Sequence, residues 1–387
     1  MDETAERPYG QWKELYREVV TTNLCTGCAA CVMACPRDVL GYDHSVTYHP
    51  FNYEPTTTFD DCLHGHRGCD ICTKACPRFR LWEIEADTAL FGRPRTPEEV
   101  IGIHRDIYLV RATDAGIKEK GQDGGLVSAL LIWGLENEKI EGALVSKLSD
   151  DPKRPWDTYP FLATTRDEVL ASAGSRYTYS ANPLAMKDAE ARGIKNVALV
   201  GMSCQASING TLAARNVNKY KKRIQLTIGL LCSKSFTYEG MMVDKISKQM
   251  GIPLTDVSKV NIKGKFILWR KSTGEQIDIP LKECHPYTRE GCKLCPDFAA
   301  EHADISTGGL GQSDGWTLTI VRTERGAEWM KGLMDAGWVE VRPGSEDPAA
   351  VKLMEKLSAK SRKRWPAALG NGAGAPGVQP PPEVTDA

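Results

Sequence analysis

The sequence has almost no net charge and no long apolar run. It carries 49 Lys and Arg against 50 Asp and Glu, a formal charge of −1 at pH 7. This balance argues against a nucleic-acid binder that depends on a basic surface. The longest uncharged stretch before the C-terminal tail, residues 196–214, contains Ser, Gln, Asn and Thr and would not span a bilayer. Residues 1–7 are polar and acidic, so we expect no signal peptide and a cytoplasmic protein that reaches a membrane only through partners.

What the sequence has in excess is cysteine, with 13 in 387 residues. Eight lie between Cys25 and Cys76, and the other five are Cys204, Cys232, Cys284, Cys292 and Cys295. An odd number clustered at C-x2-C spacing argues against a disulfide scaffold and for bound metal in a reducing compartment. The remaining composition, 41% hydrophobic and 26% charged, is typical of a globular protein, and the length suggests two or three domains.

The first cysteine block reads C-x2-C-x2-C-x3-C-P and ends at Pro36. This spacing is typical of bacterial ferredoxins, in which the fourth cysteine crosses to a second [4Fe–4S] cluster. A partial repeat that ends at Pro77 has the same C-x2-C-x3-C-P ending. Pseudo-symmetry therefore predicts two electron-transfer clusters, one bound by Cys25, Cys28, Cys31 and Cys76 and the other by Cys35, Cys62, Cys69 and Cys72. Zinc and disulfides are the alternatives, although zinc sites more often use two separated C-x2-C pairs. His64 and His66, in the insertion of the repeat, are expected to face solvent.

Three regions follow one another along the chain. Residues 1–95 should form a ferredoxin-like domain, and residues 366–387, rich in Gly, Ala and Pro, should be disordered. Between them, in residues 96–365, short β runs alternate with helical segments, which predicts an α/β (α+β) domain. The expected strands are 107–110, 143–146, 197–200 and 224–231, and the expected helices are 126–137, 183–192, one after Cys204, and 349–364. Runs at 260–263, 266–269 and 276–279 resemble a meander, so we expect the sheet to be mixed.

The five later cysteines do not form one obvious motif. Cys292 and Cys295 make a lone C-x2-C, while Cys204 and Cys232 each lie at the end of a predicted strand. Because strand ends converge at one edge of an open α/β sheet, these four could make a third site. Cys284 competes for one position in it. The alternative is that Cys204 and Cys232 are small buried apolar residues.

Two glycine-rich segments could approach a ligand closely. Gly121-Gln122-Asp123-Gly124-Gly125 precedes a predicted helix, whose first N–H groups would favour an anion such as a phosphate. It does not match G-x-G-x-x-G, so a Rossmann site is not supported. Residues 304–316 run from a strand into a second glycine-rich loop, suited to a flat cofactor. For each segment the alternative is a tight turn without a ligand.

From about residue 106 to residue 364, the sequence resembles the β-subunit family of coenzyme F420 hydrogenases and dehydrogenases. The segments that carry the resemblance are 122–125, 174–180, 204–205, 291–297, 303–308 and 314–316. The resemblance implies a non-Rossmann mixed α/β flavin domain that binds FAD and one [4Fe–4S] cluster and exchanges hydride with coenzyme F420. The implied ligands of that cluster are Cys204, Cys232, Cys292 and Cys295, which leaves Cys284 over.

The resemblance also implies a set of flavin-binding residues. They are Gln122, Asp123, Gly124, Gly125, Ser175, Tyr177, Asn182, Ser306, Gly308, Asp314 and Gly315. No separate catalytic residue is expected, because hydride transfer at a flavin needs no general base. The anionic tail of coenzyme F420 could meet a basic side chain, and the candidates are Arg176, Lys234, Lys263 and Lys293.

The cysteine-rich N-terminal region makes the chain resemble the F420 dehydrogenase subunits that feed complex-I-like membrane machines. The expected function is oxidation of reduced coenzyme F420 by hydride transfer to FAD. Single electrons would then pass through three [4Fe–4S] clusters to partner subunits. The alternatives are a hydrogenase or formate dehydrogenase β subunit that works in the opposite direction, a non-catalytic electron relay without flavin, and a reductase of a tetrapyrrole-like substrate.

Overall fold

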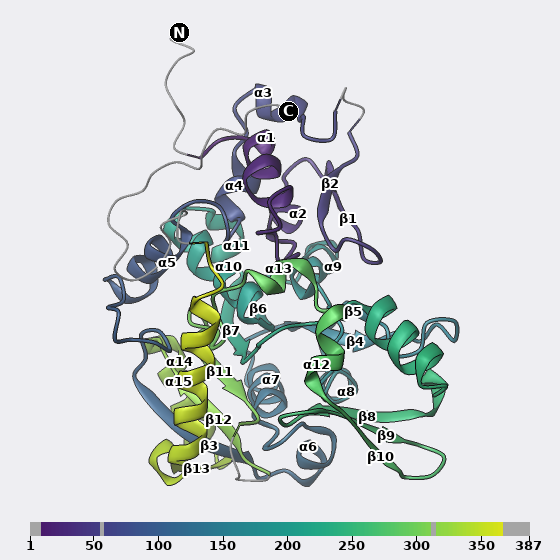
Figure 1. The fold of residues 1–387 in the computed structure, drawn as a ribbon. Helices are drawn as coiled ribbons and strands as arrows, with labels where there is room; N and C mark the ends of the chain where they lie inside the picture. The colour runs from purple at the N-terminus through teal and green to yellow at the C-terminus, as the bar shows by residue number, and fades with distance from the viewer. Residues whose placement is uncertain (1–8, 55–57, 311–314, 367–387) are drawn as a thin grey trace.

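The computed structural model describes residues 9–54, 58–310 and 315–366. A cysteine-rich N-terminal part, residues 9–92, lies against a larger part built on an eight-stranded sheet, residues 93–366 (Figure 1). We call these two parts the cysteine unit and the sheet unit. Figure 1 shows the cysteine unit at the top, and the C-terminal helix of the sheet unit ends near it. The tail expected over residues 366–387 lies outside the described residues except for Pro366.

The cysteine unit consists of short elements around its cysteine loops. They are α1 (Trp12–Leu15), a π-helical turn (Tyr16–Val20), α2 (Ala30–Ala34), the antiparallel pair β1 (Leu40–Tyr42) and β2 (Pro50–Asn52), α3 (Leu63–His66), α4 (Ile71–Ala75) and α5 (Trp82–Phe91). Helices α2 and α4 end at Cys35 and Cys76, whose backbones are extended. Each is followed by proline, which disfavours helical geometry in the residue before it. The repeat in the sequence is therefore also a repeat in the structure.

The large sheet has a parallel centre and antiparallel edges. Its strand order is β13-β3-β12-β11-β7-β6-β4-β5, and β11, β7, β6 and β4 run parallel. The strands are β3 (Asp106–Ala112), β4 (Gly142–Leu148), β5 (Thr158–Ala163), β6 (Val197–Met202), β7 (Ile224–Leu230), β11 (Ile305–Gly308), β12 (Thr317–Val321) and β13 (Val339–Pro343). The central strands are apolar and buried, as expected for strands covered on both faces.

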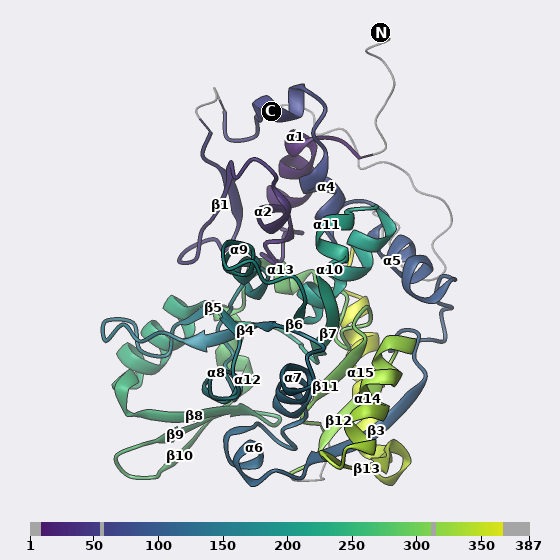
Figure 2. The same ribbon diagram turned by 180° about the vertical axis from the view of Figure 1, so that it is seen from behind.

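Helices cover both faces of this sheet (Figure 2). On one face, α7 (Leu126–Glu136) and α14 (Glu324–Asp335) pack against alternate strand residues, and Trp133 meets Trp329 edge to face at 5.5 Å. On the other face lie α9 (Met186–Ala191), α10 (Ser203–Ala214) and α15 (Pro348–Arg362). Helix α10 also contacts α5, so one helix joins the core of the sheet unit to the cysteine unit. Helices α6 (Ala115–Lys120) and α8 (Arg166–Ala171) lie with α7 on the first face, and α11 (Asn218–Lys221) lies with α10 on the second.

The meander expected from the sequence forms a sheet of its own instead of extending the large one. Its strands are β8 (Val257–Ile262), β9 (Phe266–Arg270) and β10 (Gln276–Ile279), all antiparallel. They pack with the π-helical segment Tyr238–Gln249 and with α12 (Leu281–Cys284) around a separate apolar core. The large sheet is nevertheless mixed, because β5, β12 and β13 each run antiparallel to a neighbour. None of the helices within the described ranges is long and apolar enough to cross a membrane.

Candidate iron–sulfur and flavin site

Two cavities in the cysteine unit are each lined by four cysteines. One is lined by Cys25, Cys28, Cys31 and Cys76, and the other by Cys35, Cys62, Cys69 and Cys72. These are the two groups that pseudo-symmetry predicted. Each group takes three cysteines from one half of the unit and the fourth from the other half. His64, which was expected to face solvent, lines the second cavity and lies 3.3 Å from Glu54.

The backbone around the first cavity has two residues with positive φ and approaches neighbouring groups closely. Gly27 and Ala29, which flank Cys28, both have positive φ, at 70° and 60°. An added methyl group on Gly27 would overlap the backbone oxygen of Tyr48 and the guanidinium of Arg289. Only a residue without a side chain allows the loop to approach these groups so closely.

The thiols of the first cavity are buried and free of disulfides. Burial raises the pKa of Cys25, Cys28 and Cys76 to about 12, and neighbouring thiols add to the effect. Within the ranges that the structure covers, no group of three His, Cys, Asp or Glu side chains could hold a single metal ion. Four buried thiols around a cavity instead fit a [4Fe–4S] cluster, in which each thiolate binds a different iron.

The third group of cysteines lies at one edge of the large sheet. Met202 of β6 and Thr307 of β11 both pair with Leu230 of β7, so the carboxyl ends of the three strands lie side by side. Cys204 and Cys232 follow two of these ends. The C-x2-C pair lies in and after α13 (Glu290–Lys293). Burial raises the pKa of Cys232, and the thiols of Cys292, Cys204 and Cys295 raise it further, so the four thiols lie near one another.

Cys284 lies away from these four residues. It is fully buried in the apolar core around the small sheet, and its Sγ lies 3.8 Å from the backbone oxygen of Pro280. Burial raises its pKa to about 11, and the charged groups that act on it are Lys245, Glu283 and Lys234. No cysteine is among them. This placement fits a small buried apolar residue.

The two glycine-rich segments lie against each other. An added methyl group on Gly309 would overlap the carboxylate of Asp123. The backbone N–H of Gly124 donates to Thr317 Oγ1 at 2.9 Å, which ties the first loop to the start of β12. Gly125 has φ of +73° and directly precedes α7. The two glycine-rich segments thus pack together beside the first turn of α7, whose backbone N–H groups favour an anion such as a phosphate.

The other residues implied for flavin binding divide into two classes. The first lies around the glycine-rich segments, and the second is engaged in hydrogen bonds inside the protein. Tyr177 is near Asp123 and Cys232, burial raises its pKa to about 12, and its hydroxyl is 3.1 Å from Asn261 Oδ1. Ser175 lies nearby and is partly exposed. Gly308 packs against Leu231, and Gly315 has φ of +76° with open space around it. Asp314 lies outside the described residues.

Asn182 and Ser306 are the second class, because protein groups already occupy their polar atoms. The amide of Asn182 donates to Val200 O at 2.7 Å and accepts from the Ser180 hydroxyl. Ser306 donates to Ala300 O at 2.8 Å and accepts from Arg322. Both side chains are at most 5% exposed. Such saturated, buried groups fit a structural role better than direct contact with a flavin.

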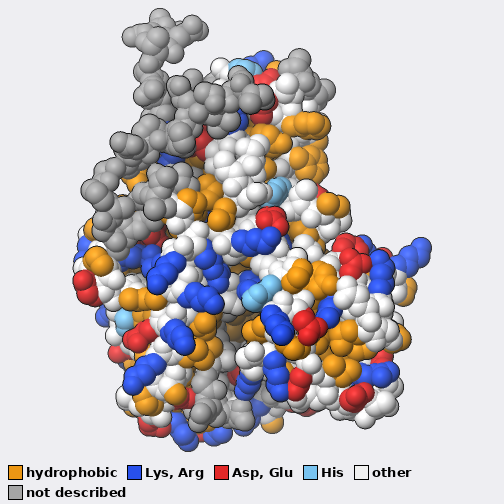
Figure 3. Space-filling model, in the orientation of Figure 1, with side chains coloured by type: hydrophobic (Ala, Val, Ile, Leu, Met, Phe, Trp, Pro, Cys, Tyr) orange, Lys and Arg blue, Asp and Glu red, His pale blue; other side chains and the backbone are white. Residues whose placement is uncertain are grey.

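The basic residues suggested for the coenzyme tail also differ from one another. Arg176 donates to the backbone oxygens of Ser146, Ser172 and Ala173, so it holds the chain together. Lys293 pairs with Glu290 at 2.6 Å. The pKa of Lys234 is lowered by burial and by the nearby positive charges of Arg364 and Lys360. Figure 3 shows this face of the molecule hollowed beside α15, with Lys and Arg side chains on both sides of the hollow.

Three buried residues between the two units were not predicted from the sequence. Arg78 lines the first cavity and donates to Cys295 Sγ at 3.4 Å. Arg289 donates to Thr26 O at 2.9 Å and stacks 3.6 Å from the ring centroid of Tyr179. The hydroxyl of Tyr179 is 3.5 Å from Cys204 Sγ. Arginine is usually exposed, so no pattern marked these two arginines. The position of Arg78 directly after Cys76-Pro77 was the one available signal.

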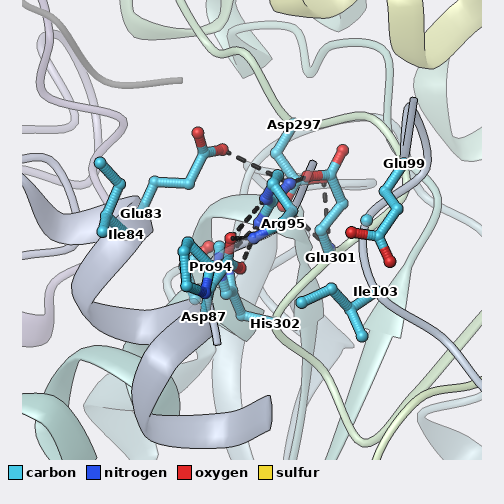
Figure 4. Close-up of polar contacts among 12 residues, drawn as sticks. Glu83, Ile84, Asp87, Pro94, Arg95, Glu99, Ile103, Asp297, Glu301 and His302 are labelled. Carbon is cyan, nitrogen blue, oxygen red and sulfur yellow. Dashed lines mark hydrogen bonds and ion pairs between the residues drawn. The ribbon is translucent and has the colours of Figure 1, made fainter. Parts of the chain in front are cut away.

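A second, purely ionic contact joins the units around α5 (Figure 4). Arg95 donates to both carboxylate oxygens of Asp87 at 2.6 Å, pairs with Glu301, and lies 3.0 Å from His302 Nε2. Arg362 of α15 pairs with Glu83 at 3.2 Å and also with Glu301. We call this group of residues (Glu83, Asp87, Arg95, Glu301, His302 and Arg362) the carboxylate seam. All but Arg362 are at most 5% exposed.

Comparison with known families agrees with this arrangement. Residues 107–187 match the model "Coenzyme F420 hydrogenase/dehydrogenase, beta subunit N-term", and residues 194–347 match the corresponding model for the C terminus of the same subunit. Residues 18–40 match "4Fe-4S binding domain". Fold and site thus define an iron–sulfur protein of an F420-linked oxidoreductase class. More specifically, the chain belongs to the coenzyme F420 hydrogenase/dehydrogenase β-subunit family.

Individual relatives cover different parts of the chain. The β subunit of the coenzyme F420 hydrogenase of Methanothermobacter thermautotrophicus is 36% identical over 68% of this chain and 94% of its own length. The F subunit of the F(420)H(2) dehydrogenase of Methanosarcina mazei is 29% identical over 89% of this chain and 91% of its own length. A chain of the F420-reducing [NiFe] hydrogenase complex from Methanosarcina barkeri has a similar fold, with a TM-score of 0.64 and 30% identity over 69% of this chain and 91% of that one.

Proposed function

We propose that this protein oxidises reduced coenzyme F420 at a flavin in the sheet unit and delivers single electrons through the cysteine unit to a partner subunit. One observation carries the proposal. A continuous buried cluster contains cysteines of all three groups, from Cys204 at the sheet edge through Cys25 to Cys62. Such a row of buried thiol groups suits a chain of iron–sulfur clusters between an inner site and the surface.

We infer the direction of the reaction from the share of this chain that each relative matches. The hydrogenase subunit from M. thermautotrophicus matches 68% of the chain, whereas the dehydrogenase subunit from M. mazei matches 89%. A match of that extent must include part of the cysteine unit, and this favours the dehydrogenase direction.

The residues that would hold the clusters are the three groups of four cysteines. Bound there, the clusters would supply one-electron transfer, and FAD would supply the change from two-electron to one-electron chemistry. The first group is buried throughout, whereas Cys69 in the second group and Cys232, Cys292 and Cys295 in the third are partly exposed. Cys284 takes no part, because it lies in the core of the small sheet.

The flavin would be held by the two glycine-rich segments, at Gln122–Gly125, Gly308 and Gly309, with Tyr177 near Asp123 beside them. At Gly124 and Gly309 an added methyl group would overlap protein atoms, so the two segments lie this close only because these positions have no side chain. The N–H groups at the start of α7 would face the diphosphate. Asn182 and Ser306 would act one layer further out, by fixing β6 and β11, respectively, through their buried hydrogen bonds.

The partner would dock on the outer surface of the cysteine unit. Of the seven large apolar side chains that are exposed in the described ranges, five lie there: Val46, Phe51, Tyr53, Phe59 and Leu63. Leu63 follows Cys62, which lines the second cavity. An apolar patch with aromatic side chains beside an electron-carrying site suits a protein interface.

Anaerobic spectroscopy of the full chain tests this proposal. We expect bound flavin, with a visible absorption band that bleaches when reduced coenzyme F420 is added, followed by iron–sulfur signals. Flavin that is bound but not bleached would contradict the proposed substrate. Iron–sulfur signals without any flavin would instead identify an electron relay.

Iron content tests the third cluster. Cys232→Ser should lower the iron from about 12 to about 8 atoms per chain, because a [4Fe–4S] cluster needs its full ligand set. Cys284→Ser is the matched control and should retain all of the iron. Equal iron in both variants would refute the assignment of Cys232.

A further inference from the structure

Arg78 lies between the first and the third cysteine groups. It is 2% exposed, lines the cavity of Cys25, Cys28, Cys31 and Cys76, and donates to Cys295 Sγ. Its guanidinium lies 4.3 Å from the ring centroid of Trp82, and one of its amino groups donates to Pro77 O at 2.6 Å. Its Nε has no hydrogen-bond partner. No ion pair with a carboxylate is found for it in the described part of the chain.

Arg289 belongs to the sheet unit and lies at the same contact between the two units. It is 4% exposed and lies over the rings of Tyr179 and Tyr48, at 3.6 and 4.8 Å from their centroids. It donates to Thr26 O, beside Cys25, while its backbone N–H bonds to Ser235 O, three residues after Cys232. Its Nε is also unpartnered. Again the described residues provide no carboxylate pair for it.

A buried guanidinium without an anion is costly, so a counter-charge is expected nearby. The groups that act on Arg78 are the thiols of Cys295 and Cys204, followed by the buried carboxylate of Asp297. The group that acts most on Arg289 is the thiol of Cys292, followed by Tyr179. A [4Fe–4S] cluster with four thiolates carries a net charge of about −2 when oxidised and about −3 when reduced. Two such clusters would surround the two arginines with negative charge.

We propose that Arg78 and Arg289 set the reduction potentials of the first and third clusters by placing permanent positive charge between them. The guanidinium groups would stabilise the reduced form of either cluster more than the oxidised form, because the reduced form has one more negative charge. Both potentials would thereby be raised. The electron would pass from the third cluster to the first, and the two arginines would exchange neither a proton nor an electron.

This inference rests on the proposed function only through the presence of the clusters. Its test uses the full chain with clusters bound, and the readouts are iron content and a redox titration followed by electron paramagnetic resonance. Coenzyme F420 is not needed in this experiment. Failure of coenzyme oxidation and failure of the potential shift are therefore separate results.

The decisive variants are Arg78→Gln and Arg289→Gln, each compared with the lysine variant at the same position. Glutamine removes the charge, so we expect the midpoint potentials of the first and third clusters to become more negative. Lysine retains the positive charge, so the midpoint potentials in the lysine variants should be close to those of the unaltered protein. The cluster of Cys35, Cys62, Cys69 and Cys72 is an internal reference and should not shift. Arg67→Gln, at an exposed arginine of the same unit, is the matched control.

Each possible result of these measurements supports or overturns the proposal that the two arginines set the potentials. Unchanged potentials in glutamine variants that contain full iron would overturn the proposal. Equal loss of iron in the glutamine and lysine variants would also overturn it, because the role would then be structural. Loss of iron with glutamine but full iron and normal potentials with lysine would support it, since the charge alone separates the two variants.

Discussion

Two of the arginine groups at which the cysteine unit and the sheet unit meet differ in what balances their charge. In the carboxylate seam, Arg95 and Arg362 are paired with Asp87, Glu83 and Glu301. Arg78 and Arg289 instead face thiols, tyrosine rings and backbone oxygens. We call this second group the thiol seam. Trp82 contacts both groups, because its ring centroid lies 4.3 Å from the guanidinium of Arg78 and 5.4 Å from the ring centroid of His302.

The difference separates two tasks that buried charge can perform. Every charged residue of the carboxylate seam is paired with an opposite charge of the polypeptide itself, so the seam can fix the position of α5 before any cofactor binds. In the thiol seam Asp297 is the only carboxylate among the main groups that act on Arg78, and no carboxylate is among those that act on Arg289, so most of the negative charge would come from bound clusters. Stability should therefore depend mostly on the first seam, and electron transfer on the second.

The largest expected effect comes from breaking the carboxylate seam. Arg95→Met would leave Asp87 and Glu301 buried with too little positive charge, at a cost of about 4–5 kcal/mol of unfolding free energy. Denaturant unfolding followed by circular dichroism measures this loss. The control is Arg93→Met, which removes an exposed pair with Glu99 and should cost less than about 1 kcal/mol. Equal effects of the two variants would contradict the distinction between the seams.

The carboxylate seam should also be sensitive to acid. Burial acts to raise the pKa of Asp87, but the hydrogen bonds from His302 and Arg95 outweigh it and hold the pKa below the ordinary 3.8. Arg95 and Arg362 likewise lower the pKa of Glu83 below 4.5 against the effect of burial. Groups with a lowered folded pKa stabilise the protein above their unfolded values, and this contribution is lost as the pH falls through the folded pKa.

Asp87→Asn is the variant that isolates this pH effect. At pH 7 it should cost about 3 kcal/mol of unfolding free energy, because Arg95 loses a buried anionic partner. The difference from the unaltered protein should narrow as the pH falls below about 4, where Asp87 of the unfolded chain starts to bind a proton. Urea unfolding at several pH values measures it. A difference that stays constant with pH would show that the charge of Asp87 is not involved.

A smaller effect on stability is expected from a substitution that pushes apart the two loops at the thiol seam. An added methyl group on Gly291 would overlap the backbone oxygen of Cys25, so Gly291→Ala should push the loop of Cys292 away from the first cavity. We expect a loss of about 1–3 kcal/mol and altered spectra of the first and third clusters. Gly116→Ala, where the nearest atom is 3.3 Å away, is the control and should not destabilise the protein. Normal spectra in Gly291→Ala would argue against close contact of the two loops.

The smallest effect on stability should come from the outer surface, away from both seams. Phe59 is 75% exposed, so Phe59→Asp should change the unfolding free energy by no more than about 0.5 kcal/mol. Electron transfer to the partner complex should nevertheless fall, while reduction of a small dye is unchanged. Leu353→Asp, on the exposed side of α15, is the control and should affect neither. Normal transfer in Phe59→Asp would place the partner elsewhere.

The sequence predicted those parts of the site that depend on local spacing. The two groups of four cysteines were predicted because C-x2-C-x3-C-P occurs twice. The third group was only one alternative from the ends of the expected strands, and the resemblance to the family supplied its full set of four. Strands were also expected where apolar runs were continuous, as in β6 and β7. By contrast, β12 and β13 were not predicted. The first directly follows a glycine-rich loop, and the second is short and has mainly exposed residues.

What the sequence could not reveal depends on contacts between distant segments. The surroundings of Arg78 and Arg289 come from residues more than 200 positions apart along the chain, as in the contact of Arg78 with Cys295. The saturated hydrogen bonds of Asn182 and Ser306 also depend on the tertiary fold. A motif marks which residue types occur together, but it does not show whether their polar atoms are already engaged by the protein.

The exchange of ligands between the halves of the cysteine unit has a consequence for biosynthesis. Cys76 completes the group that begins at Cys25, and Cys35 belongs with cysteines that follow it by 27 positions or more. A nascent chain therefore has no complete set of four until Cys72 is synthesised. The set of the second cavity is complete first, the set of the first cavity follows at Cys76, and the sheet-edge set waits for Cys295. Ligands for the outermost proposed carrier are thus available first, and those for the carrier nearest the proposed flavin site last.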